Sequence, residues 1–217
     1  AENLVFRRMV DTDRSFNDLA FPGSLFYHQP LEVRLDSFDA KSPHQPSYTQ
    51  LASEPVPSGS QNRRRFVHAV AQLDPQVIFD GSLQLPMGQE DSIRDLADAY
   101  RRLPAGRMHR LSDQPGSNQT QPVTIRYVNQ VDGTYVCVVN DAPFRVTARI
   151  GVLVPGGCRL DELTGRRRVE PLRTDANGTY WAVDLEPYDL IAVRLSHPQA
   201  KLANSRIFLP SGVGSEI

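Results

Sequence analysis

Cysteine, methionine and tryptophan are scarce in this sequence, which has two, three and one of them among 217 residues. Two cysteines cannot build the disulfide framework that stabilises many small secreted domains. We expect Cys137 and Cys158 to be buried free thiols, and a single bridge between them is the less favoured alternative. No segment reaches the roughly 20 consecutive apolar residues of a membrane-spanning helix, so we expect no membrane partner.

The chain also lacks an excess of charge of either sign. It has 24 basic and 25 acidic residues, for a formal net charge of −1. Such a balance gives no electrostatic reason to expect nucleic acid as a partner. No two histidines have the spacing of zinc ligands, and neither a nucleophile elbow nor a phosphate-binding glycine loop is present. We therefore expect no metal and no cofactor.

What the chain does have is 40% hydrophobic residues, enough to bury the core of one large or two small domains. Helical spacing of apolar residues appears over 62–74 and 88–104, with the short apolar run "QVIFD" (76–80) between them. Helix, buried strand and helix in this order are typical of an α/β sheet. Residues 39–61 are rich in proline and serine, which predicts an irregular loop.

Beyond residue 112 the hydrophobic period becomes two. The clearest strand is "PFRVTARIGV" (143–152), and "NGTYWAVDLEPYDLIAVRLS" (177–196) reads as two strands joined at a Glu-Pro corner. Half-buried strands with frequent turn signals are typical of an antiparallel sandwich. We therefore predict a mixed α+β chain with three parts: an α/β segment over 1–112, an antiparallel β-sandwich over 113–198, and a C-terminal tail over 199–217.

Three motifs of the second half resemble the β-sandwich that follows the catalytic (β/α) barrel in many glycoside hydrolases. They are "YVCVVND" (135–141), "LDELTGRRR" (160–168) and the pattern W-x-V-x-L-x-P-Y-D-L-x-A-V-R (181–194). In the first half, "RRRFVHAVAQLDPQVIFDGS" (63–82) and "EDSIRDLADAYRRLP" (90–104) resemble the last turns of such a barrel. The stretch 21–43 is similar to uncharacterised bacterial glycosidase-like proteins.

This resemblance implies that the first segment is a remnant of a barrel. A complete (β/α)₈ barrel takes about 250 residues, and about 110 precede the sandwich. The resemblance therefore implies that the chain is the C-terminal part of a longer polypeptide. It also implies a carbohydrate as partner, together with the remainder of that polypeptide, and a chain that is inactive by itself. The location is left open, with secretion or the periplasm favoured.

Glycoside hydrolysis usually needs two carboxylates, which in a barrel lie where the strands end. Asp80 is the best-placed acid because it ends the run "QVIFD", although an Asp in an Asp-Gly turn is the competing interpretation. The stretch "LEVRLDSFD" alternates Glu32, Arg34 and Asp36 on one face. The sequence thus predicts Asp80, Glu32 and Asp36 as candidate catalytic acids, and the alternative for the last two is a solvated edge strand.

Candidate sugar-binding residues lie beside these acids and in the sandwich. Arg34 could hold the acids ionised, and the neighbouring side chains of Tyr27, His28 and Asp39 could contact sugar hydroxyls or a sugar ring. In the sandwich, Tyr180 has the opposite phase to the apolar face and is expected to be an exposed aromatic. Trp181 is in phase with Val183 and is expected to be buried.

Three functions remain open at this stage. The first is a glycoside-hydrolase-like enzyme of which this chain is a part, and we rank it first. The second is a structural accessory sandwich, and the third is a sandwich that binds a glycan independently. Whether the chain belongs to an active enzyme is left open, since fold analogy alone does not establish function.

Overall fold

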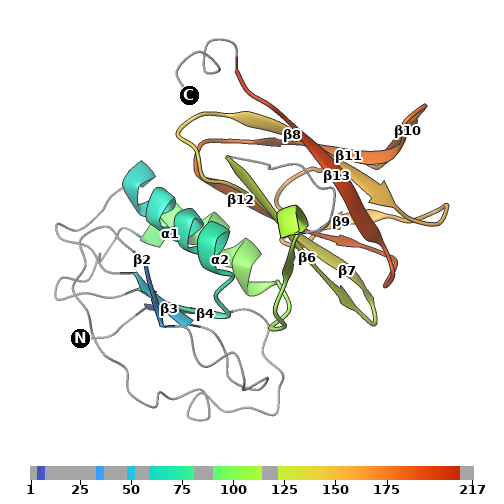
Figure 1. The fold of residues 1–217 in the computed structure, drawn as a ribbon. Helices are drawn as coiled ribbons and strands as arrows, with labels where there is room; N and C mark the ends of the chain where they lie inside the picture. The colour runs from blue at the N-terminus through green and yellow to red at the C-terminus, as the bar shows by residue number, and fades with distance from the viewer. Residues whose placement is uncertain are drawn as a thin grey trace. The chain divides into compact units, whose positions relative to one another are not determined.

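The computed structural model describes six stretches of the chain: 4–7, 33–36, 48–51, 59–80, 90–113 and 122–210. The chain divides into two compact units, Ala1–Arg107 and Met108–Ile217, which Figure 1 shows in blue to green and in green to red. The sequence analysis draws its boundary after residue 112, five residues further along. The difference arises because β5 (His109–Arg110) pairs with a strand of the second unit.

The first unit combines a small sheet with two helices. The sheet has the strand order β1-β4-β3-β2. Its strands are β1 (Leu4–Arg7), β2 (Val33–Asp36), β3 (Tyr48–Leu51) and β4 (Val77–Asp80). Helix α1 (Gly59–Leu73) connects β3 to β4, and these two neighbouring strands are parallel. A 3-10 turn, η1 (Glu90–Ile93), leads into α2 (Arg94–Arg101).

Aromatic packing and one ion pair hold α1 and α2 together. The Phe66 and Tyr100 rings meet edge to face, with centroids 5.9 Å apart. The Tyr100 hydroxyl donates a hydrogen bond to the Pro75 carbonyl oxygen at 2.8 Å, just before β4. Arg63 donates two hydrogen bonds to the Asp95 carboxylate, one from each terminal nitrogen. The predicted order of helix, strand and helix is therefore confirmed.

Two expectations for this unit differ from the structure. The described residues do not show a barrel, because β1 and β2 run antiparallel to their neighbours and only one pair of strands is parallel. Strand β3 lies inside the stretch 39–61 that the sequence analysis assigns to a loop. The four residues Tyr-Thr-Gln-Leu show too little hydrophobic alternation to predict a strand. This strand is defined by the pairing partners on either side of it.

The second unit is a sandwich of two antiparallel sheets. The five-stranded sheet has the order β5-β6-β7-β12-β9 and the four-stranded sheet the order β10-β11-β8-β13. In the first, β5 is joined by β6 (Val123–Gln130), β7 (Gly133–Asn140), β12 (Asp189–Leu195) and β9 (Leu160–Glu162). The second contains β10 (Arg173–Asp175), β11 (Gly178–Leu185), β8 (Val146–Leu153) and β13 (Lys201–Phe208).

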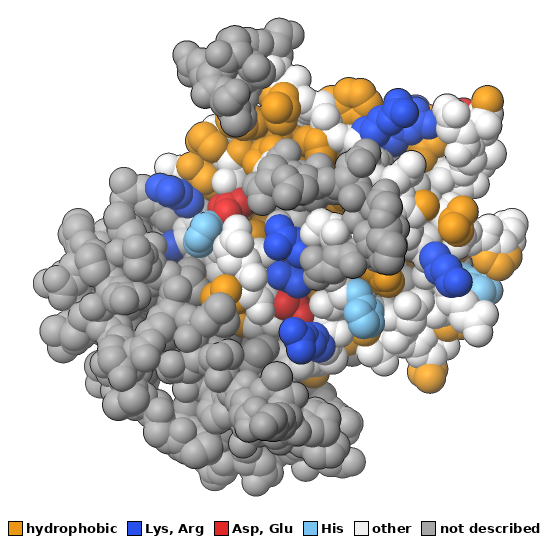
Figure 2. Space-filling model, viewed as in Figure 1, with side chains coloured by type: hydrophobic (Ala, Val, Ile, Leu, Met, Phe, Trp, Pro, Cys, Tyr) orange, Lys and Arg blue, Asp and Glu red, His pale blue; other side chains and the backbone are white. Residues whose placement is uncertain are grey.

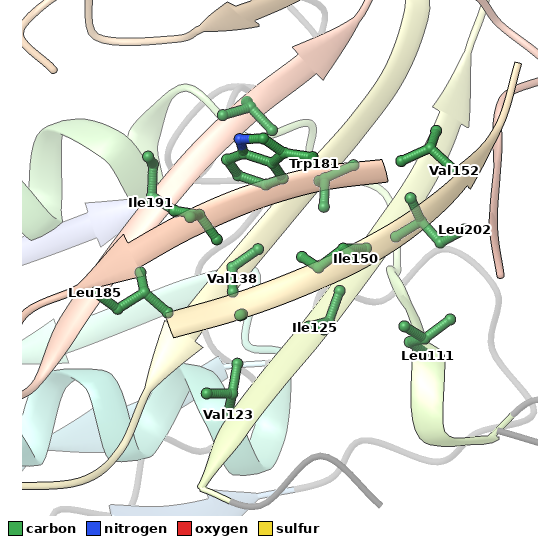
Figure 3. Packing of buried hydrophobic residues seen from close by; sticks show 14 of the residues in the cluster. Leu111, Val123, Ile125, Val138, Ile150, Val152, Trp181, Leu185, Ile191 and Leu202 are labelled. Atoms are coloured by element: carbon green, nitrogen blue, oxygen red, sulfur yellow. The ribbon is translucent and has the colours of Figure 1, made fainter. Parts of the chain in front are cut away.

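One hydrophobic core fills the space between these sheets, as Figure 3 shows. Side chains of β6, β7 and β12 meet side chains of β8, β11 and β13, and Leu111 of the 3-10 turn η2 (Leu111–Asp113) joins them. Trp181 is 2% exposed and is the largest of these side chains. Its expected burial is therefore confirmed, as is the antiparallel sandwich.

Strand β13 lies in the stretch 199–217 that the sequence analysis assigns to a tail. It pairs with β8 from Lys201 to Phe208, with a shift of register between Leu202 and Ser205. This irregularity breaks the two-residue alternation of "KLANSRIF", so that Leu202, Ser205 and Ile207 do not form a regular apolar series. Because regular apolar alternation is absent, the sequence does not predict this strand, which is defined by its pairing with β8.

The two sheets differ in their outer faces. Along β7 every residue is buried, and along β12 every residue except Arg194 is buried. On the outward side of these strands lie Cys137, Val139, Leu190 and Ala192, each at most 2% exposed. Strand β8 instead alternates between buried and more exposed residues. The strands β7 and β12 of the five-stranded sheet are thus buried on both faces, whereas the four-stranded sheet has one face in water.

Candidate functional site

Asp80 is the last residue of β4, as the sequence predicts. The backbone register pairs it with Leu51 at the end of the parallel strand β3 and with Leu4 on the other side. Because β3 and β4 are parallel and joined through α1, their carboxyl ends meet at the same edge of the sheet. In α/β proteins this edge is where catalytic side chains are most often carried.

The backbone register of β2 separates two of the other candidate residues from Asp80. Asp36 pairs with Tyr48, which in turn pairs with Val77, so Asp36 lies at the end of the sheet opposite Asp80. Arg34 pairs with Gln50 in the middle of the strand. Val33, in contrast, pairs with Leu51 and is in register with Asp80, which places the start of β2 at the same edge.

The remaining predicted residues of this segment, Tyr27, His28, Glu32 and Asp39, lie outside the described residues. Glu32 directly precedes Val33 in the chain, at the end of β2 that is in register with Asp80. The roles assigned to these side chains stay predictions, as do those of Asp80, Asp36 and Arg34.

Acidic residues of the sandwich bind backbone N–H groups and arginines of the same chain, and Asp189 is the clearest case. This residue begins β12, and its side chain is 3% exposed. Its carboxylate accepts hydrogen bonds from the backbone N–H groups of Glu186 and Leu190 at 3.1 and 2.9 Å. Arg167 binds the same carboxylate at 2.9 Å. Asp189 thereby fixes the corner between β11 and β12, where Tyr188 has a positive φ of 52°.

Asn140 has a similar structural role at the end of β7. Its side-chain amide donates hydrogen bonds to the carbonyl oxygens of Phe144 and Glu186, both at 2.8 Å. Its side-chain oxygen accepts one from the Ala142 N–H at 3.1 Å. Asn140 and Asp189 also form a directly opposed pair between β7 and β12. The two motifs "YVCVVND" and "P-Y-D-L" that carry the resemblance therefore hold neighbouring loops together.

The motif "LDELTGRRR" is also organised around a carboxylate. Glu162 accepts hydrogen bonds from the Thr164 hydroxyl at 2.8 Å and from the Arg166 N–H at 3.2 Å. Gly165 takes the positive φ of 70° that the turn requires. Arg167 then reaches Asp189. The middle one of the three arginines thus anchors this turn to the start of β12.

A fourth cluster joins the β6–β7 turn to β12 and β9. The Tyr135 hydroxyl donates a hydrogen bond to Asp132 at 2.7 Å, which lowers the pKa of that carboxyl. Burial and the same hydrogen bond raise the pKa of Tyr135. Arg194 contacts Asp132 and Asp161 at 3.3 and 3.4 Å, and the contact with Asp161 is the main cause of its raised pKa.

Tyr180 lies on the outer face of the four-stranded sheet, where the sequence predicts an exposed aromatic. It is half-buried, and the Arg149 guanidinium lies 3.6 Å from the centre of its ring. Arg149 also binds Asp175, and this contact is the main cause of the lowered pKa of the Asp175 carboxyl. One face of the Tyr180 ring is therefore covered by an arginine.

The described residues include two thiols but no group of metal ligands. Cys137 and Cys158 are both free; Cys137 is buried and Cys158 half-buried. Within the described stretches, no three His, Cys, Asp or Glu side chains are grouped as metal ligands would be. Neither helix in those stretches is long and apolar enough to cross a membrane.

The sequence matches no protein-family model and no curated protein. Among solved structures, α-galactosidase I from Mortierella vinacea aligns with a TM-score of 0.37 and 8% identity, over 64% of this chain and 35% of that one. A hypothetical protein from Leishmania major aligns with a TM-score of 0.25 and 12% identity, over 44% of this chain and 81% of that one. The chain thus spans about a third of the α-galactosidase, and at these TM-scores neither likeness assigns a function.

Sequence reasoning missed Arg167, Asn140 and Asp189 as organising residues. Each is a polar residue next to an apolar strand, where the hydrophobic pattern alone assigns no role to it. A signal was available for Asp189, since an acid between Tyr188 and Leu190 at the start of a fully apolar strand must be paired if it is buried.

Proposed function

We propose that this chain is part of a glycosidase-like, carbohydrate-active protein. In this proposal the α/β segment contributes catalytic acids, and the β-sandwich is a non-catalytic accessory domain. The observation that carries the proposal is the position of Asp80. It ends β4 in a β3-α1-β4 unit, at the edge where parallel α/β sheets hold their active sites.

Glu32 is the preferred partner of Asp80 in this proposal. It directly precedes Val33, which is in register with Asp80 across β3. Asp36 is the weaker candidate because the register places it at the opposite end of the sheet. One carboxyl group would protonate the leaving oxygen and the other would act as nucleophile or as base on water.

The assignment of the sandwich as an accessory domain rests on the partners of its acids. Asp132, Glu162 and Asp189 each accept hydrogen bonds that hold a turn or a corner. Asp175 and Asp184 bind arginines on the wet face of the four-stranded sheet. Because these carboxylates already bind partners of the same chain, they are poorly placed to donate a proton to a leaving group.

The test is turnover of a panel of aryl glycosides by the full-length protein with Asp80→Asn or Glu32→Gln, since this chain is expected to be inactive by itself. Loss of a general acid or base lowers kcat by about 10²- to 10⁴-fold, so each variant should lose at least that factor while KM changes little. Asp91→Asn is the matched control, because Asp91 is an exposed acid whose carboxylate binds Arg94, three residues along the chain. Wild-type kcat in both Asp80→Asn and Glu32→Gln would contradict the proposed roles.

A second candidate function is a sandwich that acts without catalysis, as a structural or carbohydrate-binding module. The paired state of its carboxylates favours it as well. Absence of turnover by the unmodified full-length protein on the whole panel, together with measurable glycan binding, would support this function over the first.

A further inference from the structure

The wet face of the four-stranded sheet carries an excess of basic side chains. Its four strands contain the basic residues Arg149, Arg173, Lys201 and Arg206 but only two acids, Asp175 and Asp184. The chain as a whole has a net charge of −1, so this face departs from the average in the positive direction. Figure 2 shows Lys and Arg side chains next to hydrophobic ones over the sandwich.

Two of these cations have no partner among the residues that the structure describes. Arg206 and Lys201 are exposed, and neither forms an ion pair or a hydrogen bond with any residue that the structure describes. Arg206 pairs with Arg149 in the register of β13 and β8, so both residues lie on the outer face of the sheet. The Arg149 guanidinium is turned to Tyr180 and Asp175, and Asp175 offsets its charge, whereas Arg206 has no such acid among the described residues.

Aromatic rings flank this pair of arginines on the same face. Phe208 is 53% exposed and pairs with Thr147, two residues along β8 from Arg149. Tyr180 pairs with Gly151, two residues from Arg149 in the other direction. Because residues two apart on a strand share a face, Phe208, Arg149 and Tyr180 lie along one side of the sheet. Ala182, which pairs with Arg149, is small, whereas the Asn204 side chain lies over Gly151.

The orientation of Arg149 is fixed before any ligand arrives. Its guanidinium stacks on Tyr180 at 3.6 Å and binds Asp175 through Nη2. A held arginine loses little rotamer freedom on binding an anion, and its planar group matches a carboxylate or sulfate. Asp184 and the Thr147 hydroxyl, 2.6 Å apart, add a polar pair suited to sugar hydroxyls.

We infer that the outer face of β11, β8 and β13 binds an acidic glycan, with Arg149 and Arg206 on its carboxylate or sulfate groups and Phe208 against a sugar ring. The inference rests on the carbohydrate-active character proposed above and adds the class of ligand and its place. A glycan is favoured over a nucleic acid because Asp184 and Asp175 lie among the arginines. Such acids accept hydrogen bonds from the free hydroxyl groups of a sugar, which the phosphodiester backbone of DNA does not offer.

The test is titration calorimetry of the 217-residue chain with polygalacturonate oligosaccharides, with a heparin-derived oligosaccharide, and with neutral dextran oligosaccharides. One of the two acidic ligands should bind and dextran should not, and the ligand that binds identifies carboxylate or sulfate as the recognised group. Arg206→Glu should weaken this binding at least tenfold, and Phe208→Ala about threefold to tenfold. Both side chains are exposed, so the fold should tolerate their replacement.

Matched control variants distinguish specific binding at this face from a general electrostatic attraction between the protein and polyanions. Arg168→Glu removes an exposed arginine elsewhere on the sandwich, and Val131→Ala removes an apolar side chain that is 96% exposed. Both should leave the affinity within twofold. Equal loss in Arg168→Glu, equal affinity for an oligothymidine strand, or no binding of either acidic ligand would overturn the inference. None of these outcomes depends on the turnover of Asp80→Asn, so the two proposals can fail separately.

Discussion

The two sheets of the sandwich have similar lengths and share one core, yet their outer faces are opposite in character. On the five-stranded sheet the outward positions Cys137, Val139, Leu190 and Ala192 are as dry as the core. On the four-stranded sheet the outward positions hold arginines, acids and Tyr180. A strand that has apolar side chains on both faces is usually buried on both faces. The outer face of the five-stranded sheet therefore has a structural role, and the outer face of the four-stranded sheet is the one available to a ligand.

The contrast between the two outer faces is tested most strongly by placing a charge on the buried outer face of the five-stranded sheet. Ala192 of β12 and Ala182 of β11 both point outward, but Ala192 is fully buried whereas Ala182 is half-buried beside Arg149. Ala192→Glu should lower the free energy of unfolding by about 3 kcal/mol or more, because it buries an unpaired charge. Ala182→Glu should change it by about 0.5 kcal/mol or less. Urea denaturation of the two variants makes the comparison, and equal effects would contradict it.

A second matched pair compares acids of the two sheets. Asp189→Ala removes the acceptor of two backbone N–H groups and the partner of Arg167. Arg167 is 35% exposed and can regain water, so we expect a loss of about 2–3 kcal/mol, below the usual cost of breaking a fully buried pair. Asp184→Ala, at a site 53% exposed, should cost less than about 1 kcal/mol. Thermal unfolding of both variants would contradict this account if Asp184→Ala were the more damaging.

The smallest expected effect is a dependence on pH. The hydrogen bond from Tyr135 lowers the pKa of Asp132, so its contribution to stability is present above about pH 4 and is lost as the pH falls through the lowered pKa. The raised pKa of Tyr135 gives a contribution present below about pH 10 and lost as the pH rises through it. Tyr135→Phe should flatten both limbs of the stability profile. Urea midpoints at acidic, neutral and alkaline pH measure this, and unchanged limbs would contradict it.

Much of the sandwich follows from the sequence, because β8 and β11 alternate cleanly and place Trp181 and Val183 in the core. The missed elements are those without such a pattern. The register shift between Leu202 and Ser205 hides β13, and β3 is defined by its neighbours more than by its four residues. The barrel expectation came from the stretches 63–82 and 90–104, whose order of helix, strand and helix also fits the small mixed sheet in which β1 and β2 run antiparallel to their neighbours.

For the candidate site, the end of β4 at Asp80 was predictable because an apolar run stopped by Asp-Gly ends a strand. The separation of Asp36 from Asp80 was not, since it depends on β2 running antiparallel to β3. Alternation along one strand fixes which residues share a face. It does not fix which end of the sheet they reach.

The most direct test of the contrast between the two sheets is thiol labelling of the native Ala182→Cys variant, read by peptide mass spectrometry. The account predicts rapid modification at position 182 and at the half-buried Cys158, while Cys137 on the covered face reacts only after the chain unfolds. The acidic glycan that binds should slow labelling at position 182 and leave Cys158 unchanged. Labelling of native Cys137 as fast as that of position 182 would contradict the account, because both outer faces would then be open to water.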